Sequence, residues 1–214
     1  MNRIRLIIIC CFALVSGIAF SQQPEGFVEM KDVSEFKASI IETIGNIKTI
    51  SAAFSQEKHL SIFSKTIDSQ GTMAFKAPGN LRWTYTSPYS YEILIKNQEI
   101  SINDGGKVNT FDLSSSEKFS EINGLILNSI TGKILDDERF TTTYHENATF
   151  QLVVLRPRAK EMSSLISEIH LFIDPNKKQV SKIKIVESAS DYTVIKFSNQ
   201  ILNQPMSDGI FSTP

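Results

Sequence analysis

The spacing of hydrophobic residues changes from a helical period to a strand period near residue 50. Over residues 33–47 the apolar side chains, Phe36 and Ile40 among them, recur every three or four positions, which predicts an amphipathic helix. Asp32, followed three residues later by Glu35, is typical of an N-terminal capping box.

From residue 50 onward, apolar and polar residues alternate in short runs that turn residues separate. These runs predict β-strands over residues 51–59, 70–76, 81–86, 92–96, 99–103, 150–156, 168–173, 181–187 and 192–198. Consecutive runs with such short links must pair antiparallel. A second helical pattern at residues 119–130 carries Ile122, Leu125 and Ile126, and an internal glycine and asparagine predict that this helix is short or broken.

These elements predict a single, mainly β domain with a helical cover. The chain shows about ten strands in sequential order, one helix before them and one among them, and no linker that would divide it. A twisted antiparallel sheet of that size curls. If it curls without closing, its concave face is apolar and must be covered, and the two amphipathic helices are the available cover.

Residues 1–21 have the pattern of a cleaved secretion signal. A basic start and an unbroken apolar run at residues 6–15 precede a small-x-small cleavage site at Ala19 and Ser21. The alternative is an uncleaved anchor, but the apolar stretch is shorter than the roughly 20 residues that a span needs. We therefore expect a domain of residues 22–214, located in the periplasm.

The cysteines and the charge exclude several classes of function. Cys10 and Cys11 lie inside the signal, so the exported domain has no thiol nucleophile, thiolate metal site or redox role. Loss of Arg3 and Arg5 reduces the 22 basic side chains to 20 against 23 acidic ones, a formal charge of −3. Nucleic acid and anionic membrane surfaces would call for a basic excess, so neither is expected as the main partner.

The sequence also lacks the motifs of an enzyme. His59, His145 and His170 belong to no metal-ligand or nucleophile motif, and there is no G-x-S-x-G elbow. The acidic run at residues 136–138 lacks the spaced oxygen ligands of a calcium loop and predicts a solvated turn. No nucleotide-binding loop of the G-x-x-x-x-G-K-[ST] type occurs. We expect no catalysis, no metal and no cofactor.

The most distinctive segment is residues 70–88, where two alternating runs flank a turn at residues 78–80. Its apolar face is expected to comprise Met73, Phe75, Leu81, Trp83 and Tyr85. In an ordinary half-buried hairpin this face would simply fill a core, and that interpretation stays open.

This segment resembles the LolA-type family of periplasmic lipoprotein carriers, in which a strand, a Pro-containing turn and an apolar-Arg-Trp-x-Tyr strand run into a second proline. The matching stretches are Phe75-Lys76-Ala77-Pro78, Leu81-Arg82-Trp83-Thr84-Tyr85, Pro88, Phe54-Ser55-Gln56, GKILDDERF at residues 132–140, and DGIFSTP at residues 208–214. Together, in this order and spacing, they cover nearly the whole of the expected domain.

The resemblance implies an open half-barrel of about ten to eleven antiparallel strands under a lid of amphipathic helices. It implies a monomeric carrier that takes the acyl chains of lipoproteins from the inner to the outer membrane. Its expected partners are acylated lipoproteins, an ATP-driven exporter in the inner membrane and an acceptor at the outer membrane. The expected lipid-binding residues are Phe36, Ile40, Met73, Phe75, Leu81, Trp83, Tyr85, Ile122, Leu125 and Ile126.

One position departs from the family pattern. Many family members carry an arginine immediately before the first proline of the segment, where it helps to latch the lid, and here that position is Ala77. Arg82 fits the family's Arg-Trp variant and is the expected latch, although a looser lid or a different latch is equally open. Alternation defines two faces, and we expect the face of Trp83 to be the concave one.

Two other functions stay open at this point. The same fold could carry another lipid or lipid-linked product, or the chain could be an exported structural or interaction domain whose curved face is a filled core.

Overall fold

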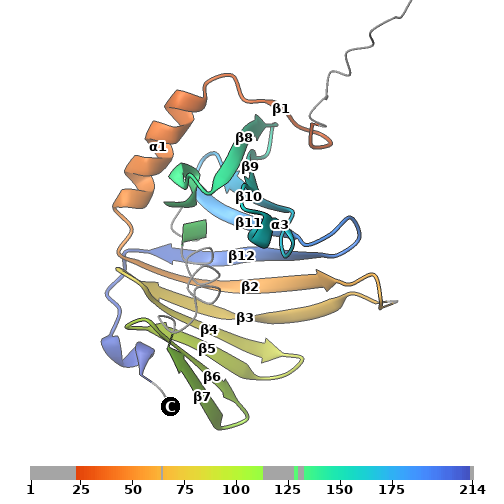
Figure 1. Ribbon diagram of the computed structural model, residues 1–214. Coiled ribbons are helices and arrows are strands. Elements are labelled where there is room, and N and C mark those ends of the chain that lie inside the picture. Colours follow the sequence, from red (N-terminus) through yellow and green to blue (C-terminus); the bar gives the residue numbers. More distant parts are fainter. Residues whose placement is uncertain (1–22, 64, 113–127, 130–132, 213–214) are drawn as a thin grey trace, which may run out of the picture.

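The computed structural model describes residues 23–63, 65–112, 128–129 and 133–212. Within them, twelve strands form one antiparallel sheet that stays open between its edge strands, β1 (Val28–Glu29) and β7 (Lys107–Asp112) (Figure 1). The prediction of a mainly β, open-sheet fold is confirmed. The expected signal and most of the expected second helix, with Ile122, Leu125 and Ile126, lie outside the described residues.

The other strands are β2 (Thr49–His59), β3 (Ile67–Lys76), β4 (Asn80–Ser87), β5 (Tyr91–Lys96), β6 (Glu99–Asp104), β8 (Phe140–Glu146), β9 (Gln151–Pro157), β10 (Glu168–Asp174), β11 (Gln179–Val186) and β12 (Tyr192–Leu202). The described helices are α1 (Val33–Gly45), the short α3 (Lys160–Ser163), and the 3₁₀ turns η2 (Lys133–Asp136) and η3 (Asp208–Phe211).

The order of strands across the sheet is β1-β8-β9-β10-β11-β12-β2-β3-β4-β5-β6-β7. The expectation of a purely sequential order is therefore wrong at two junctions, where the edge strand β1 pairs with β8 and where β12 pairs with β2. The last strand, β12, lies beside β2, and the register aligns Phe197 with Phe54 and Ile195 with Gln56. This pairing joins segments from opposite ends of the chain, so no turn or local alternation could reveal it.

Strands β1, β7 and β8 were not predicted, because they lack an apolar alternation that local pattern reading can detect. Every residue of β7 is exposed, as suits a polar edge strand. Strand β8 contains three consecutive threonines, whose branched side chains favour a strand without marking a buried face. The turn before β7 was recognised, and its Gly105 and Gly106 adopt positive φ angles of 59° and 91°.

Helix α1 forms as its sequence predicts. Asp32 caps it, because its Oδ1 accepts a hydrogen bond of 2.9 Å from the backbone N–H of Glu35. Phe36 and Ile40 lie on the side of the helix that faces the sheet, and both are buried. In Figure 1 α1 runs along the side of the sheet that β8 to β11 form.

One face of the sheet carries two hydrophobic clusters. We call it the inner face and define it by the side chains of Leu81, Trp83 and Tyr85. The first cluster combines α1 and η2 with the inward residues of β8 to β11, such as Val153 and Leu171. The second cluster lies over β2 to β5. Phe197 of β12 packs against both clusters, so the apolar surface is continuous across the sheet.

The second cluster depends on a glycine at position 71. A Cβ atom there would lie 2.0 Å from the backbone oxygen of Thr84 and 2.7 Å from Cζ of the Phe54 ring. Real Cβ atoms do not approach other atoms this closely, so only glycine leaves room for the Phe54 ring beside position 71.

We expect Gly71→Ala to lower the free energy of unfolding by about 1–3 kcal/mol, because the new methyl group overpacks the cluster. Gly45→Ala is the matched control, since a Cβ at Gly45 meets nothing within 4 Å. Urea unfolding followed by the fluorescence of Trp83 measures both variants. If the two variants are equally stable, the packing argument at Gly71 is wrong.

Candidate functional site

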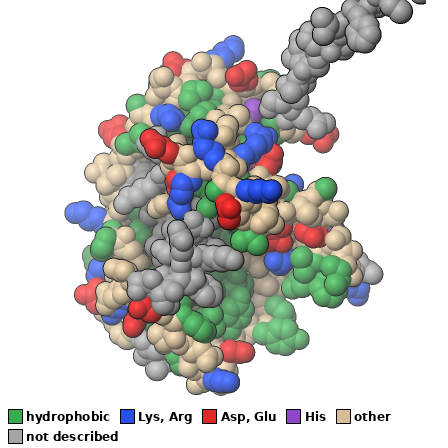
Figure 2. All heavy atoms as spheres, in the orientation of Figure 1, with side chains coloured by type: hydrophobic (Ala, Val, Ile, Leu, Met, Phe, Trp, Pro, Cys, Tyr) green, Lys and Arg blue, Asp and Glu red, His purple; other side chains and the backbone are tan. Residues whose placement is uncertain are grey.

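The inner face is the candidate site, because it gathers most of the described residues that the sequence assigned to binding. Strand β4 shows the local reason: Leu81, Trp83 and Tyr85 alternate with polar residues and are only 1%, 7% and 8% exposed. Met73 and Phe75 of β3 pair with Trp83 and Leu81. In Figure 2 hydrophobic side chains gather over the region of β3 and β4.

The centre of the second cluster is a group of aromatic rings, which we call the aromatic cluster: Phe54, Trp83, Tyr85, Tyr91 and Phe197. The centroid of the Trp83 ring lies 4.3 Å from that of Phe54 and 6.0 Å from that of Phe197. Tyr85 stacks on Tyr91 at 4.3 Å. Such contacts stabilise the cluster beyond its burial alone.

The polarity of the inner face changes along the strands. At one end, Ile50, Phe75, Leu81 and Ile95 pair in one row across β2 to β5, and we call this row the apolar end. All four side chains are nearly fully buried.

The opposite end, which we call the polar end, comprises Gln56, Tyr85 and Tyr91. The Tyr85 hydroxyl donates a hydrogen bond of 2.9 Å to Oε1 of Gln56. Burial, and then its interaction with Tyr85, raise the pKa of Tyr91 well above the ordinary value, so its hydroxyl stays protonated. This end therefore offers neutral hydrogen-bonding groups beside aromatic rings.

A small cavity lies between α1 and the sheet. Ile40 of α1, Ile50 of β2 and Leu171 of β10 are among its lining residues, and its volume is about 20 Å³. A cavity of this size holds one water molecule. The inner face is thus closely packed here, and a long hydrocarbon chain would need α1 to move.

The predicted binding residues fall into the two clusters rather than one. Phe36 and Ile40 belong to the first cluster, whereas Met73, Phe75, Leu81, Trp83 and Tyr85 belong to the second. The residues of the second group lie on the inner face itself, whereas Phe36 and Ile40 lie on α1 and pack against that face. Their role in binding stays a prediction.

Sequence reasoning did not select Phe54, Tyr91 or Phe197 as binding residues, although each packs in the aromatic cluster. Phe54 stands in the F-x-Q motif, and Phe197 alternates correctly within a predicted strand. Either signal could have placed the residue on the inner face, but neither could reveal that both rings meet Trp83. The contact of Phe197 depends on the pairing of β12 with β2, and that of Phe54 on the pairing of β2, β3 and β4.

Arg82 lies on the opposite, outer face. Its guanidinium pairs with Glu92, with 2.8 Å between Nη2 and Oε1, and its Nη1 donates a hydrogen bond to the backbone oxygen of Ile210. Lys76 similarly binds Asp208 at 2.6 Å. In this structure Arg82 therefore holds the C-terminal segment, and its assignment as a lid latch stays a prediction.

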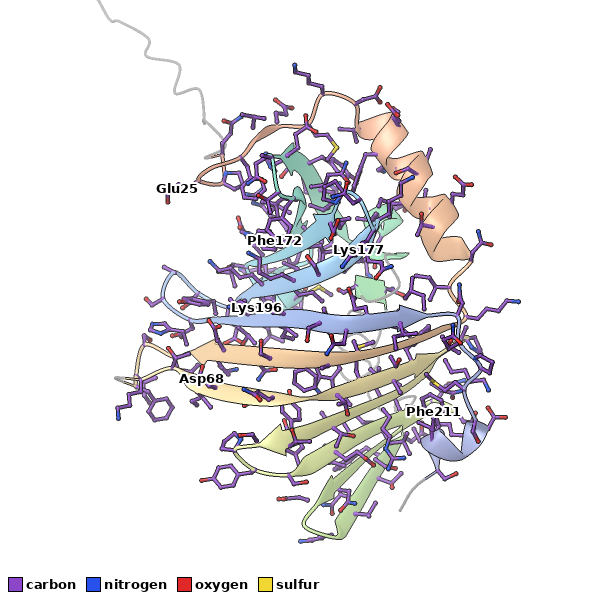
Figure 3. The ribbon with its side chains drawn as sticks, turned by 180° about the vertical axis from the view of Figure 1, so that it is seen from behind. Glu25, Asp68, Phe172, Lys177, Lys196 and Phe211 are labelled. Carbon is purple, nitrogen blue, oxygen red and sulfur yellow. The ribbon has the colours of Figure 1, made fainter. Side chains whose placement is uncertain are left out.

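The C-terminal segment packs through Phe211, which is 1% exposed and lies on η3 beside β4 and β5 (Figure 3). The outer face thus has an apolar anchor flanked by the ionic contacts of Lys76 and Arg82.

The described residues contain no group of three or more His, Cys, Asp or Glu side chains that could hold a metal ion. His170 binds Glu168 on the outer face, and burial lowers the pKa of both His170 and His145, which favours neutral imidazoles. In the same part of the chain no helix is long and apolar enough to cross a membrane.

Comparison with known proteins gives consistent matches. The model of the family described as "Outer membrane lipoprotein carrier protein LolA" matches residues 45–214. An outer-membrane lipoprotein carrier protein of Francisella tularensis subsp. novicida is 27% identical over 90% of this chain and 84% of its own length. A protein of the same description from Coxiella burnetii is 24% identical over 99% of this chain and 94% of its own length.

Among solved structures, an uncharacterized conserved protein from Thermus thermophilus superposes with a TM-score of 0.54. The two are 7% identical, and the match covers 84% of this chain and 93% of that chain. This likeness concerns the fold alone.

We expect Arg82→Gln to destabilise the protein by about 1–3 kcal/mol, because it leaves the half-buried Glu92 carboxylate without its charged partner. Glu92→Gln and the double variant complete a thermodynamic cycle measured by urea unfolding. The C-terminal segment should also become more sensitive to a carboxypeptidase. Undiminished stability together with altered ligand binding would contradict this role and favour the latch.

Proposed function

Because the chain belongs to the LolA family of outer-membrane lipoprotein carrier proteins, we propose that its inner face binds the acyl chains of lipoproteins during transfer between the two membranes. The family consists of carriers, which supports a role in lipoprotein transport and agrees with the expectation that the chain is not an enzyme. The proposal adds where the cargo binds and the direction in which it travels.

One observation carries this proposal: the inner face is apolar across both clusters, yet the sheet is not closed into a barrel. A closed barrel of this size would have a cavity with a fixed perimeter. An open sheet whose apolar face is covered by separate elements can expose that face when a cover moves away. Such a surface suits a flexible hydrocarbon chain, which has no fixed shape to match.

The energetic need for such a surface is large. Burial of an acyl chain is worth about 0.8 kcal/mol per CH₂ group, so one long chain left in water would cost on the order of 10 kcal/mol. A lipoprotein therefore needs a carrier to cross an aqueous compartment. The same magnitude means that release requires an acceptor that binds the chains at least as well.

The partners and the location follow from this need and belong to the proposal. As the resemblance to the family implies, an ATP-driven exporter in the inner membrane would load the carrier and an outer-membrane acceptor would unload it. Residues 1–21 would be removed on export, and the domain of residues 22–214 would act as a monomer in the periplasm.

Extraction of the purified, full-length processed protein with organic solvent, followed by mass spectrometry, tests the proposed cargo. We expect acylated peptides. Free lipids would redirect the proposal to another lipid cargo, and the absence of any lipid, together with failure to bind a synthetic lipopeptide, would favour an exported structural domain.

We expect Ile93→Gln to weaken lipopeptide binding by about tenfold, because Ile93 pairs with Trp83 on the inner face and loses apolar contact with the cargo. Ile93 is only half-buried, so the fold should tolerate the change. Val108→Gln is the matched control, since Val108 is exposed on edge strand β7 and should leave affinity unchanged. Equal affinities of the two variants would contradict binding at the inner face.

The small size of the cavity beside Ile40 leads to a second expectation, which concerns the movement of α1. Lipopeptide binding should increase the rate of amide hydrogen exchange in α1, because the helix must leave the first cluster, while amides in β2 and β3 stay protected. The same peptide without its acyl groups is the control. Unchanged or slower exchange in α1 on binding of the acylated peptide would rule out opening by this helix.

A further inference from the structure

Trp83 has an unsatisfied hydrogen-bond donor at the centre of the inner face. Its side chain is buried, and its Nε1 finds no hydrogen-bond acceptor within the part of the chain that the structure describes. Buried tryptophan N–H groups normally have a partner, and a donor without one costs about 1–3 kcal/mol. The position thus retains a buried polar N–H group that a smaller phenylalanine ring would not carry.

The described rings that pack on Trp83 offer no strong acceptor. Phe54 lies 4.3 Å away between ring centroids, and Phe197 meets the indole edge-on at 6.0 Å. Met73 pairs with Trp83 across the strands, and its thioether is only a weak acceptor. A ligand that occupies this surface could supply the missing acceptor.

The surroundings of Trp83 indicate what kind of ligand fits. Towards one end of the strands lies the apolar end, with Ile50, Phe75, Leu81 and Ile95. Towards the other lies the polar end, where the Tyr85 hydroxyl donates to Gln56. Trp83 stands in the row between them, because it precedes Tyr85 by two residues on the same strand. The order along the strands is therefore hydrocarbon, a single N–H donor, then neutral hydroxyl and amide groups.

An acyl ester has the same order of polarity: a hydrocarbon tail, a carbonyl oxygen that accepts hydrogen bonds, and a polar linkage beyond it. We propose that the Trp83 Nε1–H donates to an ester carbonyl oxygen of the bound acyl group. The methyl ends of the chains then point to the apolar end, and the linkage lies at the polar end. This inference rests on the proposed function and adds an orientation and a chemical preference for the cargo.

The ester carbonyl is shared by acylated proteins and free glycerolipids, so the inference names the ester group rather than its source. The three groups that define the polar end, Gln56, Tyr85 and Tyr91, are neutral, and the nearest cation on the same strand, Lys58, is paired with Glu187 at 3.2 Å. They can therefore hold an ester without requiring a charge on the cargo.

The test compares two synthetic lipopeptides that differ only in the linkage of their two hexadecyl-length chains: one ester-linked, the other ether-linked and without carbonyl groups. Calorimetry measures the affinity of the processed full-length protein for each. The wild type should prefer the ester about three- to tenfold, the value of one hydrogen bond. In Trp83→Phe this ratio should fall to nearly one. Phe197→Leu is the matched control, because it removes a ring without a donor and should retain the ratio.

A second measurement avoids any variant that could fail to fold. Trp83 is the only tryptophan of the chain, so its labelled indole gives a single N–H resonance. The ester probe should shift this resonance downfield relative to the ether probe, as expected for a new hydrogen bond. A short-chain diacyl glycerophospholipid that produces the same shift would show that the site recognises the ester from either source.

The outcomes separate this inference from the proposed function. If both lipopeptides bind equally well to the wild type, with the same indole resonance, the ester site is wrong while acyl binding at the inner face stands. If Trp83→Phe retains the ester preference, Trp83 is not the donor. If neither lipopeptide binds, the proposed function itself fails.

Discussion

The structure depends on one constraint: the apolar face of an open sheet must be shielded from water although the sheet does not close on itself. The twelve strands end at two edges, β1 and β7, so no strand pairing can cover the inner face. Helix α1 and the turn η2 cover the part over β8 to β11, where Phe36, Ile40 and Ile134 meet the sheet. The surface that stabilises the fold is therefore the same surface to which the proposed function assigns the cargo. This cover is held mainly by apolar side chains, with Lys37 lying over the Tyr144 ring, and the proposed function requires that an acyl chain can replace these contacts.

The two halves of that face are united by a contact between distant segments. Strand β12 pairs with β2, and Phe197 thereby reaches both clusters. On the other side of β2, the ring of Phe54 needs the space that Gly71 leaves, and so comes within 4.3 Å of Trp83. The aromatic cluster thus results from one non-local pairing and one glycine. Ionic pairs such as Arg82–Glu92 and Lys196–Glu57 lie on the outer face, where they do not interrupt the apolar surface.

Much of this architecture could be predicted from the sequence, because the period of the hydrophobic pattern directly determines which residues share a face. Strand β4 alternates so regularly that Leu81, Trp83 and Tyr85 were placed together, and the cap at Asp32 located the start of α1. Long-range partners could not be predicted, because they depend on how distant segments meet. Alternation does place Arg82 opposite Trp83, but its contact with Ile210 spans 128 positions of the chain. Strand β7 was missed since a fully exposed strand has no buried face to show in its sequence.

A carrier must bind strongly enough to protect its cargo and still release it, and the chemistry of the inner face fits both demands. Apolar contact supplies affinity without a preferred direction, because hydrocarbon makes no directional bonds. An ion pair between carrier and cargo in the same place would fix the orientation of the cargo. Breaking that pair inside an apolar site would, however, leave a buried charge at high cost. Neutral donors such as Trp83 and Tyr85 avoid this difficulty, since a single uncharged hydrogen bond is worth only about 1 kcal/mol net. In the proposed site, the gradient from Leu81 to Gln56 would therefore orient an amphiphile while most of the affinity came from its chains, and the orienting hydrogen bond would add little to the barrier for release.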